Sequence, residues 1–324
     1  MKRLLIYCFY DKNGIVDNYV SYFLNKIRKF CYEICVVVNG KITDTSEECL
    51  GKYADKIIKK ENKGYDSGAF RHAVYSYGFD YLKQYDEVIF ANDTFYGPLF
   101  NLEQLFTEME LKQDNDFWGI TKHPSIDIKV AGVQINEHLQ SYFLVYKNNI
   151  LSSLDFKEYW DKMKTPTNYE EAVAFYELYT TAFFINKGYK PGSLINIKAN
   201  FHQENRPYFY DVIKWIKKEH VPFIKKKIFE LDTKYLKHEI NGGIFKLFET
   251  IKTQTNYDTD LIIKNVQRVY QKELNQRTLI LIFIEYIYIH IKKAVQPWKN
   301  RHYNAKIRKI KNKLNLITIL KEQN

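Results

Sequence analysis

The stretch Glu61-Asn62-Lys63-Gly64-Tyr65-Asp66-Ser67-Gly68-Ala69-Phe70-Arg71 decides the fold. It follows a short strand predicted at residues 56–59 and opens a helix predicted at 69–77. Its two glycines can adopt backbone shapes closed to other residues, and the amides at a helix start attract phosphate. We therefore expect this segment to bind a nucleotide diphosphate, with the following contacts: Asn62, Gly64, Asp66, Ser67, Gly68 and, one turn into the helix, Arg71. A plain turn with a helix cap is the alternative.

The second informative stretch is Val88-Ile89-Phe90-Ala91-Asn92-Asp93-Thr94-Phe95-Tyr96-Gly97-Pro98. An apolar strand, predicted at 87–91, ends here in polar residues before a Gly-Pro turn. Ligands of α/β sheets bind at the carboxyl ends of the strands. Asp93 is thus predicted to hold Mg²⁺ or Mn²⁺ against the diphosphate, and Asn92 to join the nucleotide-binding set. The alternative is that Asp93 caps the turn through neighbouring amides.

Strands and helices alternate through the first 120 residues, which implies right-handed crossovers and a largely parallel sheet. Short strands follow at 117–146, then a helix at 169–186 and a Gly188-Tyr189 turn; the chain beyond Asn200 reads as helical. The predicted class is α/β, with a Rossmann-type nucleotide-binding domain at 1–231. A mostly helical, basic extension at 232–324 completes the prediction.

The positive charge lies at one end of the chain. The 324 residues carry 49 Lys and Arg against 38 Asp and Glu, a net charge of +11, and residues 271–324 hold twelve Lys and Arg against three acids. A nearly neutral body argues against a nucleic-acid groove, although an RNA-binding tail stays open. All four cysteines fall in the first fifty residues without metal or redox spacing, and no signal peptide precedes Lys2 and Arg3. These features predict a cytoplasmic protein.

The run Thr278 to Ile291 is apolar except for Glu285 and His290. At ~14 residues it is shorter than the ~20 that span a bilayer. Lys and Arg flank it on both sides, so we expect a helix lying on the anionic inner face of the plasma membrane. A buried core helix with a solvated basic tail is the alternative.

Taken together, the two motifs resemble the nucleotide-sugar half of GT-A glycosyltransferases. The full sequences of the two motifs are similar to those of the rhamnan synthesis protein F family of bacterial polysaccharide enzymes, and the similarity covers residues 1–231. The resemblance continues through Phe117-Trp118-Gly119-Ile120-Thr121, His138-Leu139-Gln140-Ser141-Tyr142-Phe143, Tyr176-Glu177-Leu178, Gly188-Tyr189 and Pro222-Phe223-Ile224-Lys225-Lys226. It implies transfer of L-rhamnose from dTDP-L-rhamnose, with inversion, to a lipid-linked acceptor. A UDP-sugar donor, or a non-catalytic scaffold of polysaccharide assembly, stays open.

The resemblance also implies roles for single residues. GT-A enzymes usually carry Asp-x-Asp, whereas Asn92-Asp93-Thr94 supplies one carboxylate, which leaves metal dependence open. Glu177, eleven residues before Gly188, matches the general base of inverting enzymes; a solvated helix face is the alternative. His202 falls where a histidine returns to the metal or diphosphate, or is structural. Acceptor contacts, or else core packing, are predicted for Trp118, His138, Gln140 and Tyr142.

Overall fold

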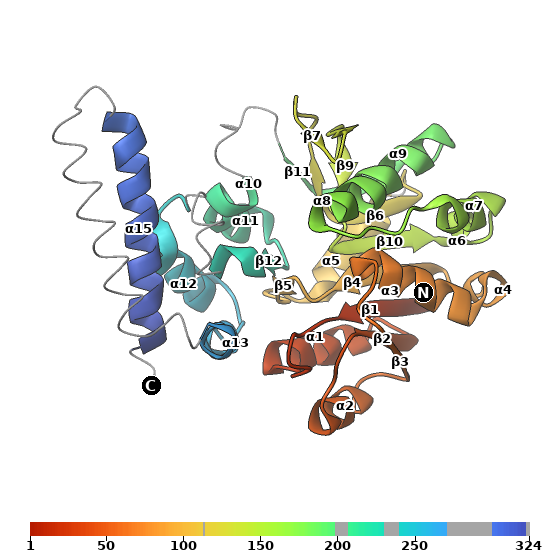
Figure 1. The fold of residues 1–324 in the computed structure, drawn as a ribbon, viewed down its shortest axis with the longest axis horizontal. Coiled ribbons are helices and arrows are strands. Elements are labelled where there is room, and N and C mark those ends of the chain that lie inside the picture. The colour runs from red at the N-terminus through yellow and green to blue at the C-terminus, as the bar shows by residue number, and fades with distance from the viewer. Residues whose placement is uncertain (113, 198–206, 230–239, 271–299, 322–324) are drawn as a thin grey trace. The chain divides into compact units, whose positions relative to one another are not determined.

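The computed structural model describes residues 1–112, 114–197, 207–229, 240–270 and 300–321, in two compact units (Figure 1). The first unit comprises Met1–Phe95 and Asn101–Ala199, and the second comprises Tyr96–Phe100 and Asn200–Asn324. The division therefore falls earlier in the chain than the boundary predicted after residue 231. It also assigns a five-residue segment, Tyr96–Phe100, to the second unit although its sequence neighbours belong to the first.

An eight-stranded sheet forms the centre of the first unit, in the order β11-β6-β10-β4-β1-β2-β3 with β9 paired to β6. Strands β3, β2, β1 and β4 run parallel, whereas β10 is antiparallel to both β4 and β6. The predicted α/β class with a parallel-rich sheet is confirmed. The strands of this sheet are β1 (Arg3–Phe9), β2 (Glu33–Asn39), β3 (Lys56–Lys60), β4 (Glu87–Asn92), β6 (Phe117–His123), β9 (His138–Leu139), β10 (Phe143–Lys147) and β11 (Pro191–Asn196). Outside it, β7 (Lys129–Val130) pairs with β8 (Val133–Gln134), and β5 (Phe95–Tyr96) pairs with a strand at Ile224–Lys225.

Helices cover both faces of this sheet, as crossovers between parallel strands require. They are α1 (Asn18–Arg28), α2 (Asp44–Gly51), α3 (Tyr65–Tyr77), α4 (Phe79–Leu82), α5 (Leu102–Leu111), α6 (Asn148–Leu151), α7 (Leu154–Lys162), α8 (Tyr169–Ala172) and α9 (Tyr179–Asn186). The helix predicted at 169–186 is present, but a π-helical segment, η1 (Val173–Leu178), lies between α8 and α9. The sequence pattern did not predict this wider turn.

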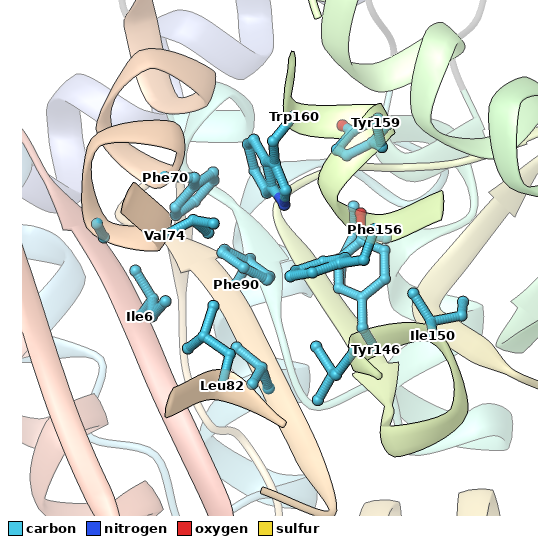
Figure 2. Packing of buried hydrophobic residues seen from close by; sticks show 14 of the residues in the cluster. Ile6, Phe70, Val74, Leu82, Phe90, Tyr146, Ile150, Phe156, Tyr159 and Trp160 are labelled. Carbon is cyan, nitrogen blue, oxygen red and sulfur yellow. The ribbon is translucent and has the colours of Figure 1, made fainter. Parts of the chain in front are cut away.

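The core has two layers, one on each face of the sheet. On one face, Phe90 of β4 packs edge-on against Phe70 of α3 and at a tilt against Trp160 of α7 (Figure 2). On the other face, Tyr7 of β1 packs against Phe23 of α1. Because every residue of β1 and β4 is buried, both strands appear in the sequence as nearly continuous apolar runs.

A buried ion pair lies at the amino ends of β1 and β4. Arg3 Nε is 2.5 Å from Glu87 Oε2, and its Nη2 is 2.6 Å from Glu110 Oε1 of α5. The guanidinium lies over the Phe106 ring, 4.3 Å from its centroid. Burial opposes the charge of Arg3, but these two carboxylates raise its pKa above the ordinary value. The ion pair therefore links β1 and β4 at their amino ends.

The described part of the second unit is mostly helical. Its elements are α10 (Pro207–Tyr210), α11 (Val212–Glu219), β12 (Ile224–Lys225), the 3₁₀ helix η2 (Lys226–Phe229), α12 (Gly243–Gln254), α13 (Asp260–Val269) and α15 (Asn300–Lys321). The Tyr96 hydroxyl donates to Asn265 Oδ1 of α13 at 2.5 Å, and its ring packs against Phe229. These contacts explain why the short segment that contains Tyr96 belongs to this unit.

Helix α15 contacts both α12 and α13, and it buries Tyr303, Ile307 and Ile310. Among the described residues, no helix combines the length and the apolar character needed to cross a bilayer. The run Thr278 to Ile291, predicted to lie on a membrane, falls outside the described residues.

Candidate active site

Two strand ends and a lysine shape the loop that precedes α3. Lys60 Nζ, at the end of β3, donates to Asn39 Oδ1 at 2.9 Å and to Lys63 O at 2.8 Å. Asn39, at the end of β2, donates in turn to Asn62 Oδ1 at 3.1 Å. Burial lowers the pKa of the Lys60 ammonium. Asn62 is thus fixed at the carboxyl edge of the sheet, where the sequence predicted a nucleotide contact.

The backbone conformation of this segment itself requires glycine at Gly64 and Gly68. Gly64 has φ +80°, a conformation that L side chains rarely adopt, and Ser67 Oγ donates to its carbonyl at 2.9 Å. A Cβ on Gly68 would lie 2.5 Å from Lys63 O, closer than any real contact. This position therefore requires glycine before any ligand is present. The predicted reason, close approach of the backbone to a nucleotide, is not needed to explain Gly68.

Asn92 joins α3 to the end of β4. Its Nδ2 donates to Asp66 Oδ2, and its Oδ1 accepts hydrogen bonds from Thr94 N at 3.2 Å and Thr94 Oγ1 at 2.6 Å. The side chain of Asn92 therefore connects the helix start to the turn that carries Asp93. Asp93 itself is buried, with 7% of its surface exposed.

Two carboxylates act on one buried thiol at this edge. Cys8 Sγ, near the end of β1, lies 3.8 Å from Asp66 Oδ1. Burial raises the pKa of Cys8 well above its usual value, and the charges of Asp66 and Asp93 raise it further. Asp66 of α3 is therefore a second carboxylate, besides Asp93, that acts on the buried thiol of Cys8.

The carboxylates of Asp66 and Asp93 can be compared with the ligands that a divalent cation needs. Within the described ranges, no group of three or more His, Cys, Asp or Glu side chains is placed to hold a metal ion. Mg²⁺, however, is commonly held by one or two carboxylates together with substrate phosphates. Asp93 and Asp66 fit that shared mode of binding, and they do not fit an all-protein cage.

Arg71 has contacts outside this cluster. Its Nη1 donates to Met163 O, just after α7, at 3.2 Å, and its guanidinium lies 5.7 Å from the Tyr75 ring centroid. The hydroxyl of Tyr75 donates to Asp161 of α7. Arg71 thus joins α3 to α7, and its predicted contact with the diphosphate stays a prediction.

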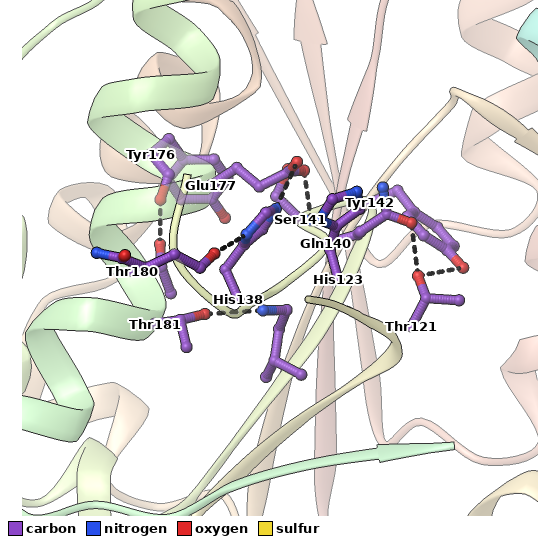
Figure 3. A network of polar contacts seen from close by, with 12 residues as sticks. Thr121, His123, His138, Gln140, Ser141, Tyr142, Tyr176, Glu177, Thr180 and Thr181 are labelled. Atoms are coloured by element: carbon purple, nitrogen blue, oxygen red, sulfur yellow. Dashed lines mark hydrogen bonds and ion pairs between the residues drawn. The ribbon is translucent and has the colours of Figure 1, made fainter. Parts of the chain in front are cut away.

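Glu177 lies in the π-helical segment η1 and holds the chain between β9 and β10 (Figure 3). Its Oε2 accepts hydrogen bonds from Ser141 N at 2.8 Å and Ser141 Oγ at 2.7 Å. Its Oε1 is 3.5 Å from His138 Nε2. Its side chain is 18% exposed. π-Helical turns are frequent at functional sites, because the extra residue redirects a side chain.

His138 is buried beside this carboxylate, at 4% exposure. Its Nδ1–H donates to Asn136 O at 2.7 Å, and its ring stacks on His123 with centroids 5.1 Å apart. Burial alone would lower the pKa of His138, but Glu177 and the Asn136 carbonyl outweigh burial and raise it above 6.5. His138 therefore supports Glu177 from inside the protein.

The other predicted acceptor residues are buried as well. Thr121 Oγ1 donates to Gln140 Oε1 at 2.8 Å and lies 3.3 Å from the Tyr142 hydroxyl, whose pKa burial raises. Trp118 is 1% exposed, packs against Phe106, and directs its Nε1 to Glu87 at 3.4 Å, at the opposite edge. The burial of Trp118 agrees with the core-packing alternative. For His138, Gln140 and Tyr142, at 4–6% exposure, the structure favours a supporting role.

The segment predicted to bind the nucleotide and the segment around Glu177 are connected where β4 ends and β10 begins. Asn92 N donates to Tyr142 O at 3.2 Å, and Phe143 pairs with Ala91. Ser141, which holds Glu177, directly precedes Tyr142 in the chain. Burial raises the pKa of Tyr176, and the charge of Asp66 adds to that shift. Asn92, which binds Asp66 and precedes Asp93, therefore lies at the same end of β4 as Ser141, which binds Glu177.

Some residues of the candidate site were not predicted from the sequence, and one predicted residue lies outside the described residues. Asn39 and Lys60 were not predicted, although both end strands of the parallel sheet, which is the available signal. Nothing in the sequence around Ser141 links it to Glu177. His202, the predicted metal residue, falls outside the described residues.

A parallel-rich α/β sheet with polar loops and carboxylates at the carboxyl ends of its strands is a common ligand-binding arrangement in α/β enzymes. The chain belongs to the rhamnan synthesis protein F family, whose model matches residues 34–313. The match extends well past residue 231, so the C-terminal helices are part of the family's sequence and not an addition to it. The chain is accordingly a glycosyltransferase of polysaccharide biosynthesis.

Individual relatives are more distant. The chain is 26% identical over 260 residues to virulence protein VirA of Vibrio anguillarum, covering 70% of this chain and 79% of that protein. It is 24% identical over 183 residues to the uncharacterized protein y4gN of Sinorhizobium fredii, covering 53% of this chain and 45% of that protein.

Two solved structures are similar in part. A 4-diphosphocytidyl-2C-methyl-D-erythritol synthase from Anaerococcus prevotii has a TM-score of 0.38 at 13% identity, covering 63% of this chain and 92% of that one. The mannosyltransferase Ktr4p from S. cerevisiae has a TM-score of 0.35 at 8% identity, covering 56% and 65%. Both scores are low, so the assignment rests on the family.

Proposed function

We propose that this glycosyltransferase moves L-rhamnose from dTDP-L-rhamnose, with inversion, onto a lipid-linked oligosaccharide. The observation that carries the proposal is that Asp66 and Asp93 adjoin Asn92 at the end of β4, and that Ser141, which binds Glu177, lies beside the start of β10. Two of these carboxylates suit the diphosphate side of the reaction, and the third is held separately by Ser141. The rhamnan of the family's name supports rhamnose as the sugar.

Each side chain then has a defined task. The loop around Asn62 and Gly64 binds the nucleotide, with its amides directed to the diphosphate. A Mg²⁺ or Mn²⁺ ion held by Asp93 and Asp66 would neutralise charge on the leaving diphosphate. Glu177 takes the proton of the acceptor hydroxyl, whose oxygen forms the new glycosidic bond on the face opposite to the leaving group.

Thermal stabilisation by dTDP, UDP and GDP tests the choice of nucleotide. A ligand that binds only the native state raises stability by RT ln(1 + [L]/Kd), or ~2.7 kcal/mol at a hundredfold excess over Kd. The proposal expects dTDP to stabilise most, with loss of the effect in Asp93→Asn when Mg²⁺ is present. Preferential stabilisation by UDP favours a UDP-sugar donor instead.

The second unit supports a location at an anionic membrane surface. It carries 25 Lys and Arg against 12 Asp and Glu, whereas the first unit carries 24 against 26. Within α15, Lys306, Arg308 and Lys311 are exposed, and the helix contains no acidic residue. Each cation near an anionic leaflet contributes about 1 kcal/mol. Docking there would place the enzyme beside a lipid-linked acceptor.

Sedimentation with phosphatidylglycerol vesicles tests this location. We expect the triple change of Lys306, Arg308 and Lys311 to Gln to weaken binding by about 10², from roughly 3 kcal/mol of lost attraction. The matched control neutralises the exposed first-unit residues Lys12, Lys41 and Lys52, and it should bind as the parent does. Equal losses in both variants, or no loss in the first, argue against docking through α15.

A further inference from the structure

The contact between His138 and Glu177 requires a shared proton. His138 Nδ1 lies 2.7 Å from the carbonyl of Asn136, so this nitrogen carries a hydrogen. Its Nε2 then faces Glu177 Oε1 at 3.5 Å. Without a proton between them, a nitrogen lone pair and a carboxylate oxygen would face each other in a buried place. The arrangement is therefore favourable only when one of the two groups holds a proton.

The surroundings of His138 contain few other charges. From β6, His123 covers one face of the ring, and Lys122 forms an ion pair with Glu137 at 3.0 Å. Glu137 precedes His138 in the chain and adds a weak attraction for a proton. From η1, Glu177 is the charged group in direct contact. The charge on His138 is thus coupled first of all to Glu177.

Glu177 offers its two oxygens to different partners. Its Oε2 accepts both hydrogen bonds from Ser141, whereas Oε1 faces His138. A carboxylate beside an imidazolium is a weaker base than one beside a neutral imidazole, because protonation would leave the buried cation without a counter-charge. The state of His138 therefore controls what Oε1 can accept.

We propose that His138 is a positioning residue that sets the basicity of Glu177, so that sugar transfer requires a neutral His138. In that state the O–H bond of the acceptor breaks, its proton passes to Glu177 Oε1, and His138 Nε2 shares it. The freed electron pair of the acceptor oxygen forms the glycosidic bond, and the nucleotide diphosphate leaves with the electrons of the old bond. This inference rests on the proposed role of Glu177 as the base.

The pH dependence of turnover tests the inference. The assay measures nucleotide release at saturating donor, using whichever of dTDP-L-rhamnose, UDP-glucose and GDP-mannose is turned over fastest. At pH values below the pKa of His138, turnover of the parent enzyme should fall about tenfold for each unit by which the pH is lowered, because a single deprotonation is required. In His138→Gln, turnover should change less than about twofold between pH 6 and 8. A variant that keeps the parent's slope overturns the inference.

A matched control separates this effect from simple loss of structure. Thr181→Val removes the hydrogen bond that Thr181 Oγ1 accepts from Leu139 N at 3.0 Å, on the same strand as His138, and removes no ionisable group. We expect this variant to keep the parent's pH profile even if its turnover is lower. Loss of the profile in Thr181→Val as well would mean that strand placement is responsible, and would contradict the proposal.

An NMR titration of the His138 ring tests the coupling without turnover, with the signal assigned by its absence in His138→Gln. Its midpoint should lie above 6.5 in the parent and fall in Glu177→Gln; an unchanged midpoint refutes the coupling. The two proposals also fail differently. If Glu177→Gln retains turnover, the proposed base is wrong. If it is inactive while His138→Gln keeps the parent's pH slope, only the present inference fails.

Discussion

Replacing Glu177 by Gln or by Ala separates its charge from its hydrogen bonds. In Glu177→Gln, the amide oxygen can accept both hydrogen bonds from Ser141, and the amide nitrogen can donate to neutral His138. This variant loses only the charge. In Glu177→Ala, the amide of Ser141 loses its acceptor, which costs about 1–3 kcal/mol if no water replaces it. The two variants should therefore differ in stability and agree in activity.

Urea unfolding and steady-state turnover measure these two effects. We expect both variants to lose about 10²–10⁴ of turnover, the usual contribution of a general base, with donor affinity nearly intact. Only Glu177→Ala should unfold at clearly lower urea. Near-normal turnover of Glu177→Gln would refute the reasoning, and Asp66 or Asp127 would then be tested as the base. If donor affinity and turnover fall together, Glu177 positions other groups or is structural.

Three further predictions concern the rest of the first unit. Asp93→Asn should lower turnover ~10²-fold or more while urea unfolding changes little, because charge at the diphosphate is lost and packing is not; near-normal turnover would remove Asp93 from the site. Gly68→Val should weaken nucleotide binding, measured by calorimetry, because its Cβ meets Lys63 O and opens the loop; unchanged affinity would count against the loop. Glu87→Ala should lower the free energy of unfolding by about 3–5 kcal/mol, because Arg3 loses its buried partner. Turnover per folded molecule should stay constant. A loss below about 1 kcal/mol would contradict this interpretation of the ion pair.

Much of the first unit could be predicted from the sequence, because its central strands are buried on both faces. The strands predicted at 56–59 and 87–91 appear as β3 and β4, each within one residue of its predicted ends. Helix α5 was not predicted, although its signals are local: Asn101 caps Glu103 N, and apolar residues recur at helical spacing. Because these signals are local, the sequence is sufficient to predict this helix.

The site could be predicted only in part, because its contacts join distant segments. The pairing of Asp66 with Asn92 depends on how α3 packs on the sheet, and no local pattern indicates it. Alternation along a strand shows which residues share a face, yet it does not show which face is covered. Trp118 was therefore predicted at a cleft and lies in the core.

The most direct test of the central claim is the rate of nucleotide release from dTDP-L-rhamnose, UDP-glucose and GDP-mannose, with Mg²⁺ present. The account predicts sustained release from one of these donors, fastest from dTDP-L-rhamnose, and a loss of about 10² or more in Glu177→Gln. Binding of a nucleotide without release from any donor would contradict it, and would identify a non-catalytic scaffold that has kept the fold.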